Sequence, residues 1–184
     1  MSGSGHKVPS GWRVAVLGGG AWGTALALAM LRAGHFVRLY ARDLETVAAI
    51  DRGENPRYLP GIALQAGIVA TSDIEAALDG ADCVLAVAPA QSLRAMLATA
   101  KAHMPKDVPL VLCAKGIERD TGALLSAIAR ETLPENPVAA LSGPSFATDV
   151  ARGLPTAVVV AAGNEGLAAD LAARFSAQNL RCYS

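Results

Sequence analysis

The sequence predicts an α/β fold, built on a doubly wound, mostly parallel β-sheet with helices on both faces. Short strand-like runs alternate with helix-like runs along almost the whole chain. The strand-like runs are apolar throughout and do not alternate with polar residues, which indicates that both of their faces are buried. Strands of this kind, separated by helices, form a parallel sheet that is covered on each side. The 184 residues are enough for one domain with a sizeable core.

The individual elements follow from β-rich and Ala/Leu-rich runs and from the Gly and Pro residues that stop them. Gly34 is placed as the C-terminal stop of the first helix. Ser72, with Glu75 three residues later, fits a capping box at a helix start. Pro89 ends the fourth strand, and the Gly and Pro residues of 51–67 predict an irregular loop. We expect strands at 13–17, 36–40, 69–71, 83–87, 110–113, 138–141, 156–162 and 181–183, and helices at 24–33, 44–50, from 72 onward, 91–102, 122–132 and 165–178.

Composition and charge exclude several classes of protein. Apolar residues make up 52% of the chain and charged residues 17%, which excludes a disordered tail or a basic nucleic-acid arm. Lys+Arg and Asp+Glu balance at 16 each, so the net charge argues for no nucleic-acid partner. No apolar run approaches the roughly 20 residues that a membrane span needs. Residues 1–11 are rich in Ser and Gly, and we expect a flexible leader there rather than a secretory signal, with the domain proper at 12–184.

The cysteines and histidines form no pattern typical of a metal site. Three cysteines lie far apart in apolar runs without a CxxC pair, which predicts buried, reduced thiols in a cytoplasmic protein. They are Cys83, Cys113 and Cys182. A catalytic cysteine is the less favoured alternative, because no histidine lies in a suggestive pattern with them. The histidines, which lack metal-ligand spacing, are His6, His35 and His103.

A glycine-rich turn after the first predicted strand is the strongest functional signal. Gly18, Gly20 and Gly23 fit the pattern G-x-G-x-x-G between a strand and a helix. Gly18 allows the tight turn, Gly20 lets a pyrophosphate approach the backbone, and Gly23 lets the helix pack closely on the strand. The helix that starts near Ala21 directs its free N–H groups and positive dipole end at the phosphates. The context predicts a Rossmann-type sheet that binds a dinucleotide; the alternative is a glycine-rich turn without a ligand.

The end of the second predicted strand is where the adenosine ribose of a dinucleotide lies in such a sheet. Arg42 and Asp43 stand there side by side. An acidic residue accepts a hydrogen bond from the 2′-hydroxyl of NAD, whereas an arginine pairs with the 2′-phosphate of NADP. Arg42 comes first, and its guanidinium can also stack on adenine, so we favour NADP(H) over NAD(H). The alternative is that both residues only serve the following helix, with Asp43 as its N-cap.

Several further segments carry a family resemblance. Besides the turn GGGAWGTALA, which begins at Gly18, they are NPRYLPG from Asn55, AVAP from Ala86, AKGIE from Ala114, SGPSFA from Ser142 and GLPT from Gly153. In kind and order they resemble the NAD(P)-dependent glycerol-3-phosphate dehydrogenases of bacterial type, and the resemblance spans 12–184. Two departures are small: Asp149 stands where many members have Glu, and Ala21 where many have Ser, so a hydroxyl near the pyrophosphate is lost.

The resemblance implies a second group of site residues. It puts Lys115 near nicotinamide and substrate, where a cation can hydrogen-bond a substrate oxygen as negative charge develops. It implies substrate contacts for Gly143 and Ser145 and a cofactor contact for Ala147, while we expect Phe146 in the core. With Lys115, the implied cofactor contacts are Gly18, Gly20, Ala21, Trp22, Gly23 and Arg42. The alternatives are an ordinary exposed lysine at 115 and, because Gly143 precedes a proline, a plain turn there.

The resemblance also implies an activity. Members interconvert dihydroxyacetone phosphate and sn-glycerol 3-phosphate by hydride transfer with NAD(P)H, which supplies glycerophospholipid synthesis. It further implies a cytoplasmic homodimer for the full-length protein, without nucleic acid, membrane or metal. The family has its principal catalytic lysine and phosphate-binding Arg and Asn in a following helical domain, whose motifs do not occur in these 184 residues. We therefore expect this chain to bind cofactor but to turn over poorly.

Two other functions stay open at this point. One is a different NAD(P)-dependent reductase with a similar first domain, of the ketopantoate or hydroxyisobutyrate type, which the Lys115–Gly116 pair and the segment 142–147 disfavour. The other is a dinucleotide-binding module without chemistry, which would not need Lys115 beside a loop of small polar residues.

Overall fold

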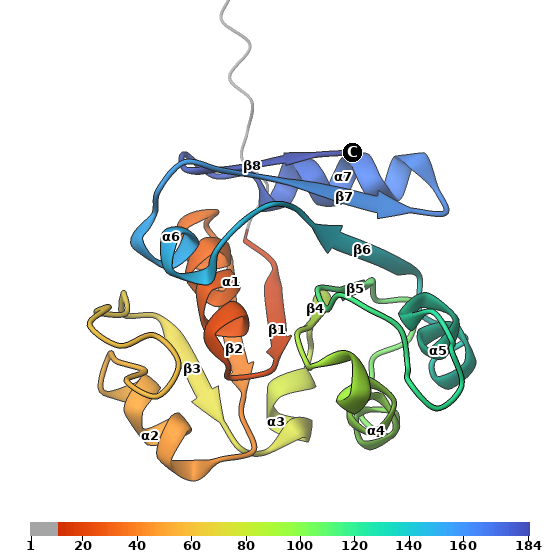
Figure 1. Cartoon of the computed structure of the whole chain (residues 1–184), viewed down its shortest axis with the longest axis horizontal. Coiled ribbons are helices and arrows are strands. Elements are labelled where there is room, and N and C mark those ends of the chain that lie inside the picture. Colours follow the sequence, from red (N-terminus) through yellow and green to blue (C-terminus); the bar gives the residue numbers. More distant parts are fainter. Residues whose placement is uncertain (1–10) are drawn as a thin grey trace, which may run out of the picture.

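The computed structural model describes residues 11–184, which form one eight-stranded sheet with helices on both faces (Figure 1). Residues 1–10 of the expected leader lie outside the described residues. The strands are β1 Arg13–Leu17, β2 Phe36–Tyr40, β3 Ile68–Thr71, β4 Cys83–Ala86, β5 Leu110–Leu112, β6 Val138–Ser142, β7 Thr156–Ala162 and β8 Leu180–Tyr183. The helices are α1 Ala21–Arg32, α2 Leu44–Asp51, α3 Ile74–Leu78, α4 Ala90–Ala100, α5 Leu125–Thr132, α6 Ala147–Arg152 and α7 Glu165–Phe175.

The order of the strands confirms the predicted doubly wound topology. It runs β3-β2-β1-β4-β5-β6-β7-β8, and every neighbouring pair is parallel except β6 and β7. The chain moves outward from β1 to β2 and β3, and then returns to place β4 on the other side of β1. Such a reversal opens a crevice at the carboxyl ends of β1 and β4, because the loops that follow the two strands diverge.

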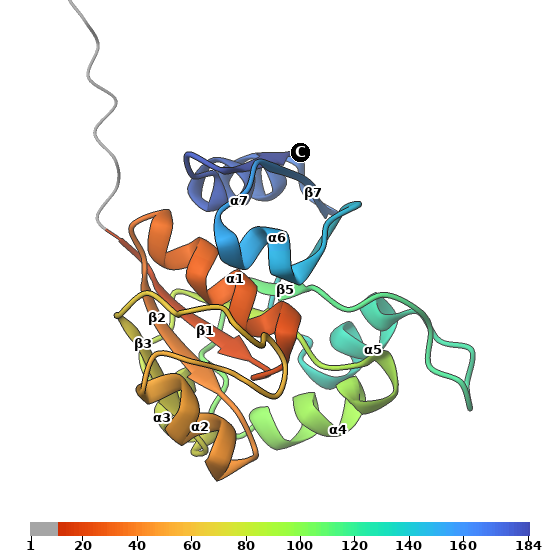
Figure 2. The ribbon, with the colours of Figure 1, turned by 60° about the vertical axis from the view of Figure 1, so that its left-hand side comes forward.

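The central strands are buried on both faces, as the sequence predicts. In β1, Val14 and Val16 pack into one core with α1, α6 and α7, whereas Ala15 and Leu17 pack into a second core with α3, α4 and α5. Figure 2 shows α6 crossing close to α1, and the two helices are in extensive contact. Because apolar side chains fill both sides, this part of the sheet is a rigid base for the loops at its carboxyl edge.

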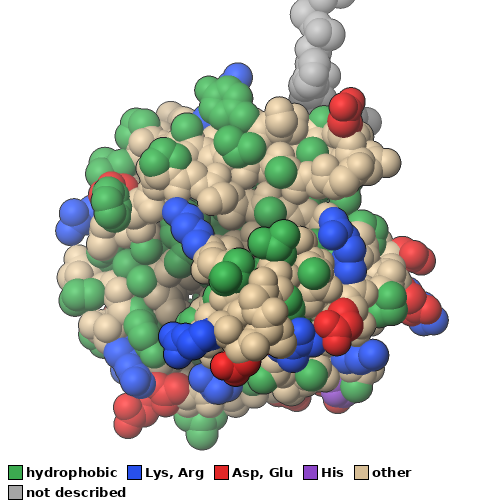
Figure 3. All heavy atoms as spheres, turned by 45° about the vertical axis from the view of Figure 1, so that its right-hand side comes forward, with side chains coloured by type: hydrophobic (Ala, Val, Ile, Leu, Met, Phe, Trp, Pro, Cys, Tyr) green, Lys and Arg blue, Asp and Glu red, His purple; other side chains and the backbone are tan. Residues whose placement is uncertain are grey.

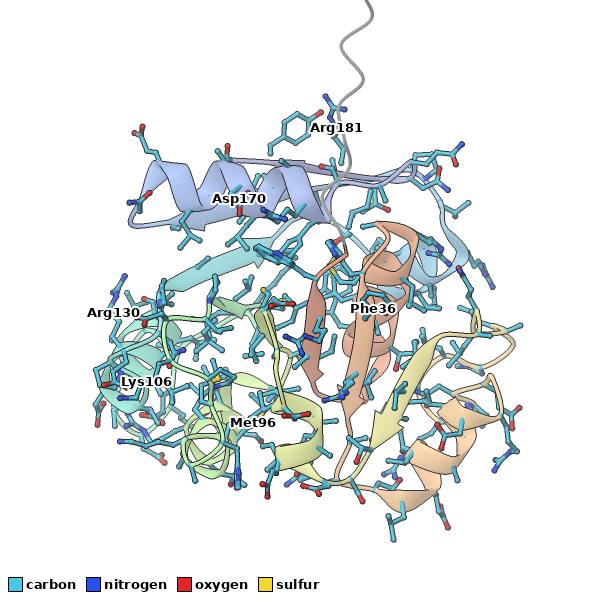
Figure 4. The ribbon with its side chains drawn as sticks, turned by 180° about the vertical axis from the view of Figure 1, so that it is seen from behind. Phe36, Met96, Lys106, Arg130, Asp170 and Arg181 are labelled. Carbon is cyan, nitrogen blue, oxygen red and sulfur yellow. The ribbon has the colours of Figure 1, made fainter. Side chains whose placement is uncertain are left out.

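The expectation that all strands are buried on both faces is wrong for the edge strand β3, in which no residue is buried and Val69 is 59% exposed. It is also wrong for β6, β7 and β8. Their residues alternate between buried and exposed, and Val159 of β7 and Tyr183 of β8 are about half exposed. Only α7 packs on β7 and β8, on one side, and Arg181 of β8 points away from the molecule on the other (Figure 4). The exposed positions of β7 are Ala and Val, so its sequence shows no polar alternation, whereas β8 exposes Arg181 and Tyr183 in alternation with buried apolar residues.

Four expectations about helices are corrected. Asp73, rather than Ser72, is the N-cap of α3, because its carboxylate accepts from the amides of both Glu75 and Ala76. The helix expected at 122–132 begins at Leu125, since Gly122 has a φ of +67° and a β-bridge joins residues 117 and 124. The helix expected at 165–178 ends at Phe175. The short helix α6 is not predicted at all.

The remaining expectations concern thiols, charge, metal and membrane. All three cysteines are buried and free, as predicted, and burial raises their thiol pKa, to about 11 for Cys182. No helix of the described part of the chain could cross a membrane. Within residues 11–184, no cluster of His, Cys, Asp and Glu could hold a metal ion. Lys and Arg side chains are spread over the face seen in Figure 3 and do not gather in one patch.

Candidate functional site

A hollow of about 580 Å³ lies at the carboxyl ends of β1, β2 and β4, where the strand order reverses. The glycine turn forms its floor, residues 40–43 at the end of β2 form one side, and residues 87–89 after β4 form the other. Part of α4, including Met96, completes the wall. The sequence predicts a ligand at this edge of the sheet, and this hollow lies there.

Each glycine of the turn has the geometry that the sequence analysis assigns to it. Gly18 has a φ of +137°, and a Cβ there would lie 2.5 Å from the carbonyl oxygen of Val87. A Cβ on Gly23 would lie 1.8 Å from the carbonyl oxygen of Gly18, so only glycine lets α1 approach the turn. A Cβ on Gly20 would meet nothing within 4 Å, because this residue faces the open hollow. Two glycines therefore form the turn, and the third leaves space above it.

Among residues 11–184, no side chain caps the amide groups at the start of α1. Gly20 is the N-cap and has no side chain that could accept from them, and the first turn carries no acidic residue. Unpaired N–H groups and the positive end of the helix dipole favour an anionic group at this position. A pyrophosphate fits the space that Gly20 leaves open, so these residues fit the dinucleotide that the sequence predicts.

Asn55, whose structural role the sequence analysis does not identify, holds the turn from below. Its side chain is 1% exposed. The Nδ2 group donates to the carbonyl oxygen of Gly19 over 3.0 Å and to Oγ1 of Thr24 over 2.9 Å. Its Oδ1 atom has no partner among the described residues. Asn55 thus ties the loop between α2 and β3 to the glycine turn and to the first turns of α1.

The far end of the hollow carries three charged side chains, Arg42, Asp43 and Arg57. Asp43 is the N-cap of α2, as the structural alternative for this residue predicts, and it lines the hollow as well. Its carboxylate accepts from the Glu45 amide over 3.2 Å and from the Thr46 hydroxyl over 2.8 Å, and it lies 3.2 Å from a guanidinium nitrogen of Arg57. The hydrogen bond from Thr46, that from Glu45 and the charge of Arg57 lower the pKa of Asp43. Arg57 is a residue that the sequence analysis does not single out.

A second, shallower hollow of about 300 Å³ lies beside the start of α1. It brings together the second group of residues that the family resemblance implies, although they come from three separate segments: Ala21, Trp22, Lys115, Gly143, Ser145 and Ala147. The Nζ atom of Lys115 donates to the carbonyl oxygen of Gly143 over 3.0 Å and is otherwise exposed. The expectation that Phe146 lies in the core is wrong: it is 75% exposed at the rim of this hollow, because as the residue before α6 it turns outward.

Two sets of contacts fix the walls of this second hollow. The Arg32 guanidinium donates to the carbonyl oxygens of Val150 and Ala151 at the end of α6, which holds that helix against α1. The segment after Lys115 projects from the body (Figure 2) and is tied back where Glu118 accepts two hydrogen bonds from Arg94 of α4. The hydrogen bonds from Arg94 and Thr121 lower the pKa of Glu118 to about 2.

Comparisons with known proteins agree with this geometry. A family model described as the N-terminus of NAD-dependent glycerol-3-phosphate dehydrogenase matches residues 13–168. A glycerol-3-phosphate dehydrogenase [NAD(P)+] of Mesorhizobium japonicum is 83% identical over 95% of this chain and 51% of its own length. One from Chelativorans is 63% identical over 94% of this chain and 53% of its own length. The chain spans about half the length of the curated relatives it matches.

A solved structure of similar fold leads to the same family. The crystal structure of a glycerol-3-phosphate dehydrogenase from Coxiella burnetii superimposes on this chain with a TM-score of 0.87 and 35% sequence identity. The match covers 95% of this chain and 54% of that protein. The strand order and the two hollows described above thus belong to a fold on which that enzyme is also built.

Proposed function

The chain belongs to the family of NAD-dependent glycerol-3-phosphate dehydrogenases, and from that premise we propose that it holds their cofactor in the larger hollow. The proposed reaction interconverts dihydroxyacetone phosphate and sn-glycerol 3-phosphate with NADPH or NADH. The observation that carries the proposal is the open space at Gly20, directly before the uncapped start of α1. Phosphate oxygens at this position would accept from backbone N–H groups that have no other partner.

The orientation of the dinucleotide follows from the two hollows. Arg42 stands at the end of β2, so the adenosine half belongs at that end of the larger hollow. The start of α1 borders both hollows, since Gly20 lines the larger one and Ala21 and Trp22 line the smaller one. The nicotinamide therefore belongs beside Trp22 and Ala147, within the smaller hollow that also holds Lys115.

The reaction requires a hydride and a proton, and the residues of this chain serve only part of it. A bound nicotinamide dinucleotide would supply the hydride to the carbonyl carbon. Lys115, already a hydrogen-bond donor to Gly143, is placed to donate to the substrate oxygen as negative charge develops on it. Gly143 and Ser145 border the same space and offer backbone groups and a hydroxyl to a small polar substrate.

We further propose that these residues alone turn the substrate over poorly. Lys115 is the one cationic side chain that lines the smaller hollow in the described part of the chain. A single lysine can hardly hold a phosphorylated substrate and also protonate its oxygen, and loss of a positioned general acid costs typically about 10²–10⁴-fold in rate. The relatives are about twice as long, so their remaining half is where we expect the phosphate ligands and the principal acid. A homodimer and a cytoplasmic location stay predictions for the longer protein.

The cofactor proposal is tested by titrating the chain with NADPH and NADH while following tryptophan fluorescence. Trp22 lines the smaller hollow, so we expect saturable quenching or energy transfer on binding. We expect NADPH to bind more tightly, because a charge-assisted pair between Arg42 and the 2′-phosphate is worth about 1.5–3 kcal/mol, or roughly 10- to 150-fold in affinity. Arg42→Ala should remove that preference and leave NADH unaffected. Absence of saturable binding of both dinucleotides would contradict the proposal.

The proposal about turnover needs a separate assay. NADPH oxidation is followed with dihydroxyacetone phosphate, on this chain and on the full-length Mesorhizobium relative. We expect the relative to be active and its counterpart of Lys115→Ala to lose most of that activity. Full activity of the 184-residue chain would show that no further groups are required.

A further inference from the structure

Arg57 lies at the adenosine end of the larger hollow, next to the carboxylate of Asp43. This end of the hollow is proposed to receive the 2′-phosphate of NADP(H). Arg57, Asp43 and Arg42 all line this end. An ionised carboxylate here would repel a 2′-phosphate, which carries up to two negative charges, unless a cation lies next to it. Asp43 is ionised, because its hydrogen bonds and its neighbour Arg57 favour the charged form. The question is what makes this end of the hollow compatible with a second anion.

The position of Asp43 is fixed by the fold. Its two carboxylate oxygens accept from the amide of Glu45 and from the hydroxyl of Thr46, both in the first turn of α2. A carboxylate that caps a helix cannot turn away from an incoming anion without leaving those donors unpaired. A cation must therefore lie next to Asp43 to compensate its charge. Arg57 is that cation, because its Nη1 atom lies 3.2 Å from Oδ2 of Asp43.

The loop that carries Arg57 is anchored as well. Arg57 comes two residues after Asn55, which is buried and bonded to the glycine turn. Its guanidinium also lies 5.3 Å from the ring centroid of Tyr58, another residue that lines the hollow. Its side chain is 65% exposed, so the guanidinium keeps donors free on the solvent side. A loop anchored under the pyrophosphate turn thus carries a cation to the other end of the same ligand.

We propose that Arg57 determines specificity for NADP(H) by neutralising Asp43, so that the charge of Arg42 is left to attract the 2′-phosphate. This inference rests on the proposed cofactor function. With Arg57 in place the three side chains sum to one positive charge, whereas without it the charges of Arg42 and Asp43 cancel. In the usual arrangement of this fold an acidic residue at the end of β2 selects NAD through the 2′-hydroxyl. Here Asp43 is retained as a helix cap, and Arg57 neutralises its charge, so that Asp43 no longer disfavours the 2′-phosphate.

The test compares dissociation constants for NADPH and NADH by isothermal titration calorimetry across five forms of the chain: unmodified, Arg57→Gln, Arg57→Lys, Asp43→Asn/Arg57→Gln and Arg52→Gln. Arg52→Gln is the matched control, because Arg52 pairs with Glu54 and does not line the hollow. Asparagine is a good N-cap, so Asp43→Asn keeps α2 capped. Thermal melting of each variant checks that it is folded.

We expect Arg57→Gln to weaken NADPH binding roughly two- to fivefold, the range for an exposed charge pair, and to leave NADH binding essentially unchanged. Arg57→Lys should keep most of the preference, and Arg52→Gln should keep all of it. The decisive form is Asp43→Asn/Arg57→Gln, which should bind NADPH more tightly than Arg57→Gln alone, because the uncompensated carboxylate is gone. If the double variant binds NADPH no better than Arg57→Gln, or if Arg57→Gln weakens both dinucleotides equally, the inference is wrong. Failure of the unmodified chain to bind either dinucleotide would instead overturn the proposed function on which it rests.

Discussion

The larger hollow lies at the carboxyl ends of the strands, and a further hollow, which we call the amino-end hollow, lies at their amino ends. Their volumes are similar, about 580 and 490 Å³, but different residues line them. At the carboxyl end, the start of α1 is uncapped and Gly20 faces open space. At the amino end, Arg38 donates to the carbonyl oxygens that end α3, and Arg13 is paired with Asp82. Volume alone therefore does not mark a ligand site. What distinguishes the carboxyl end is that the backbone amides at the start of α1 have no side-chain partner within the described part of the chain.

The comparison of the two hollows is tested most strongly by a side chain at Gly20, for which we expect the largest change in dinucleotide affinity. Gly20→Val should weaken dinucleotide binding by more than about 100-fold, or about 2.7 kcal/mol, because the side chain occupies the place of the pyrophosphate. The fold should persist, since Gly20 has a negative φ and its Cβ would meet no atom within 4 Å. Circular dichroism checks the fold, and calorimetric titration with NADPH measures the affinity.

A matched control for this prediction lies in the amino-end hollow. Phe36 is 69% exposed there, on β2 (Figure 4), and Phe36→Ala should leave the affinity for NADPH unchanged. If Phe36→Ala weakens NADPH binding while a folded Gly20→Val does not, the cofactor site lies in the amino-end hollow and not in the larger hollow.

A smaller effect is expected from the support beneath the turn. Asn55→Ala removes two buried hydrogen bonds, which should cost about 1–3 kcal/mol of unfolding free energy. The control is Asn136→Ala, because Asn136 is also buried and donates to two carbonyl oxygens, those of Pro105 and Val108, far from the turn. Both variants should lose stability in urea, but only Asn55→Ala should also weaken NADPH binding. Equal affinity in the two variants would mean that Asn55 supports the fold without positioning the turn.

The smallest effect concerns the wall that carries Lys115. The pKa of Glu118 in the folded chain is about 2, below its ordinary value of 4.5, so its pairing with Arg94 stabilises the fold above pH 4.5. That contribution falls as the pH decreases from 4.5 toward 2. Urea midpoints of the unmodified chain and of Glu118→Gln should therefore differ most near pH 6 and converge toward pH 2. Glu135→Gln, which removes an exposed pair with Lys106, is the control for the loss of a surface ion pair.

How much of this could be predicted from sequence differs between the two parts of the site. The glycine turn is predictable in detail, because each glycine answers a local steric demand that the strand-turn-helix context reveals. The group around Lys115 is reached only through family resemblance, since its residues come from separate segments and none has a distinctive local pattern. The prediction that Phe146 lies in the core is wrong because a large apolar side chain is usually buried, and only the path of the chain before α6 turns it outward.

Interactions between distant segments account for most of what sequence analysis missed. Asn55 bonds to Gly19, 36 residues earlier, and Arg32 bonds to the end of α6, more than a hundred residues later. Neither of these two contacts is indicated by a periodic or local pattern in the sequence. The half-exposed strand β7 is mispredicted for a different reason, because its exposed positions are Ala and Val, which occur equally well on a buried and on an uncovered face. Ser72 and Asp73 are neighbouring candidates for the N-cap of α3. Asp73 is the cap, because its carboxylate is a stronger hydrogen-bond acceptor than the hydroxyl of Ser72.

The most direct test of the central claim is a map of amide chemical-shift changes in the ¹⁵N-labelled chain during titration with NADPH. We expect the largest changes along Gly18–Gly23, with further changes at Arg42, Arg57 and Ala147, and none around Phe36 and Val69 at the amino end of the sheet. Changes centred on the hollow that Phe36 and Val69 line, with Gly18–Gly23 unaffected, would contradict the account.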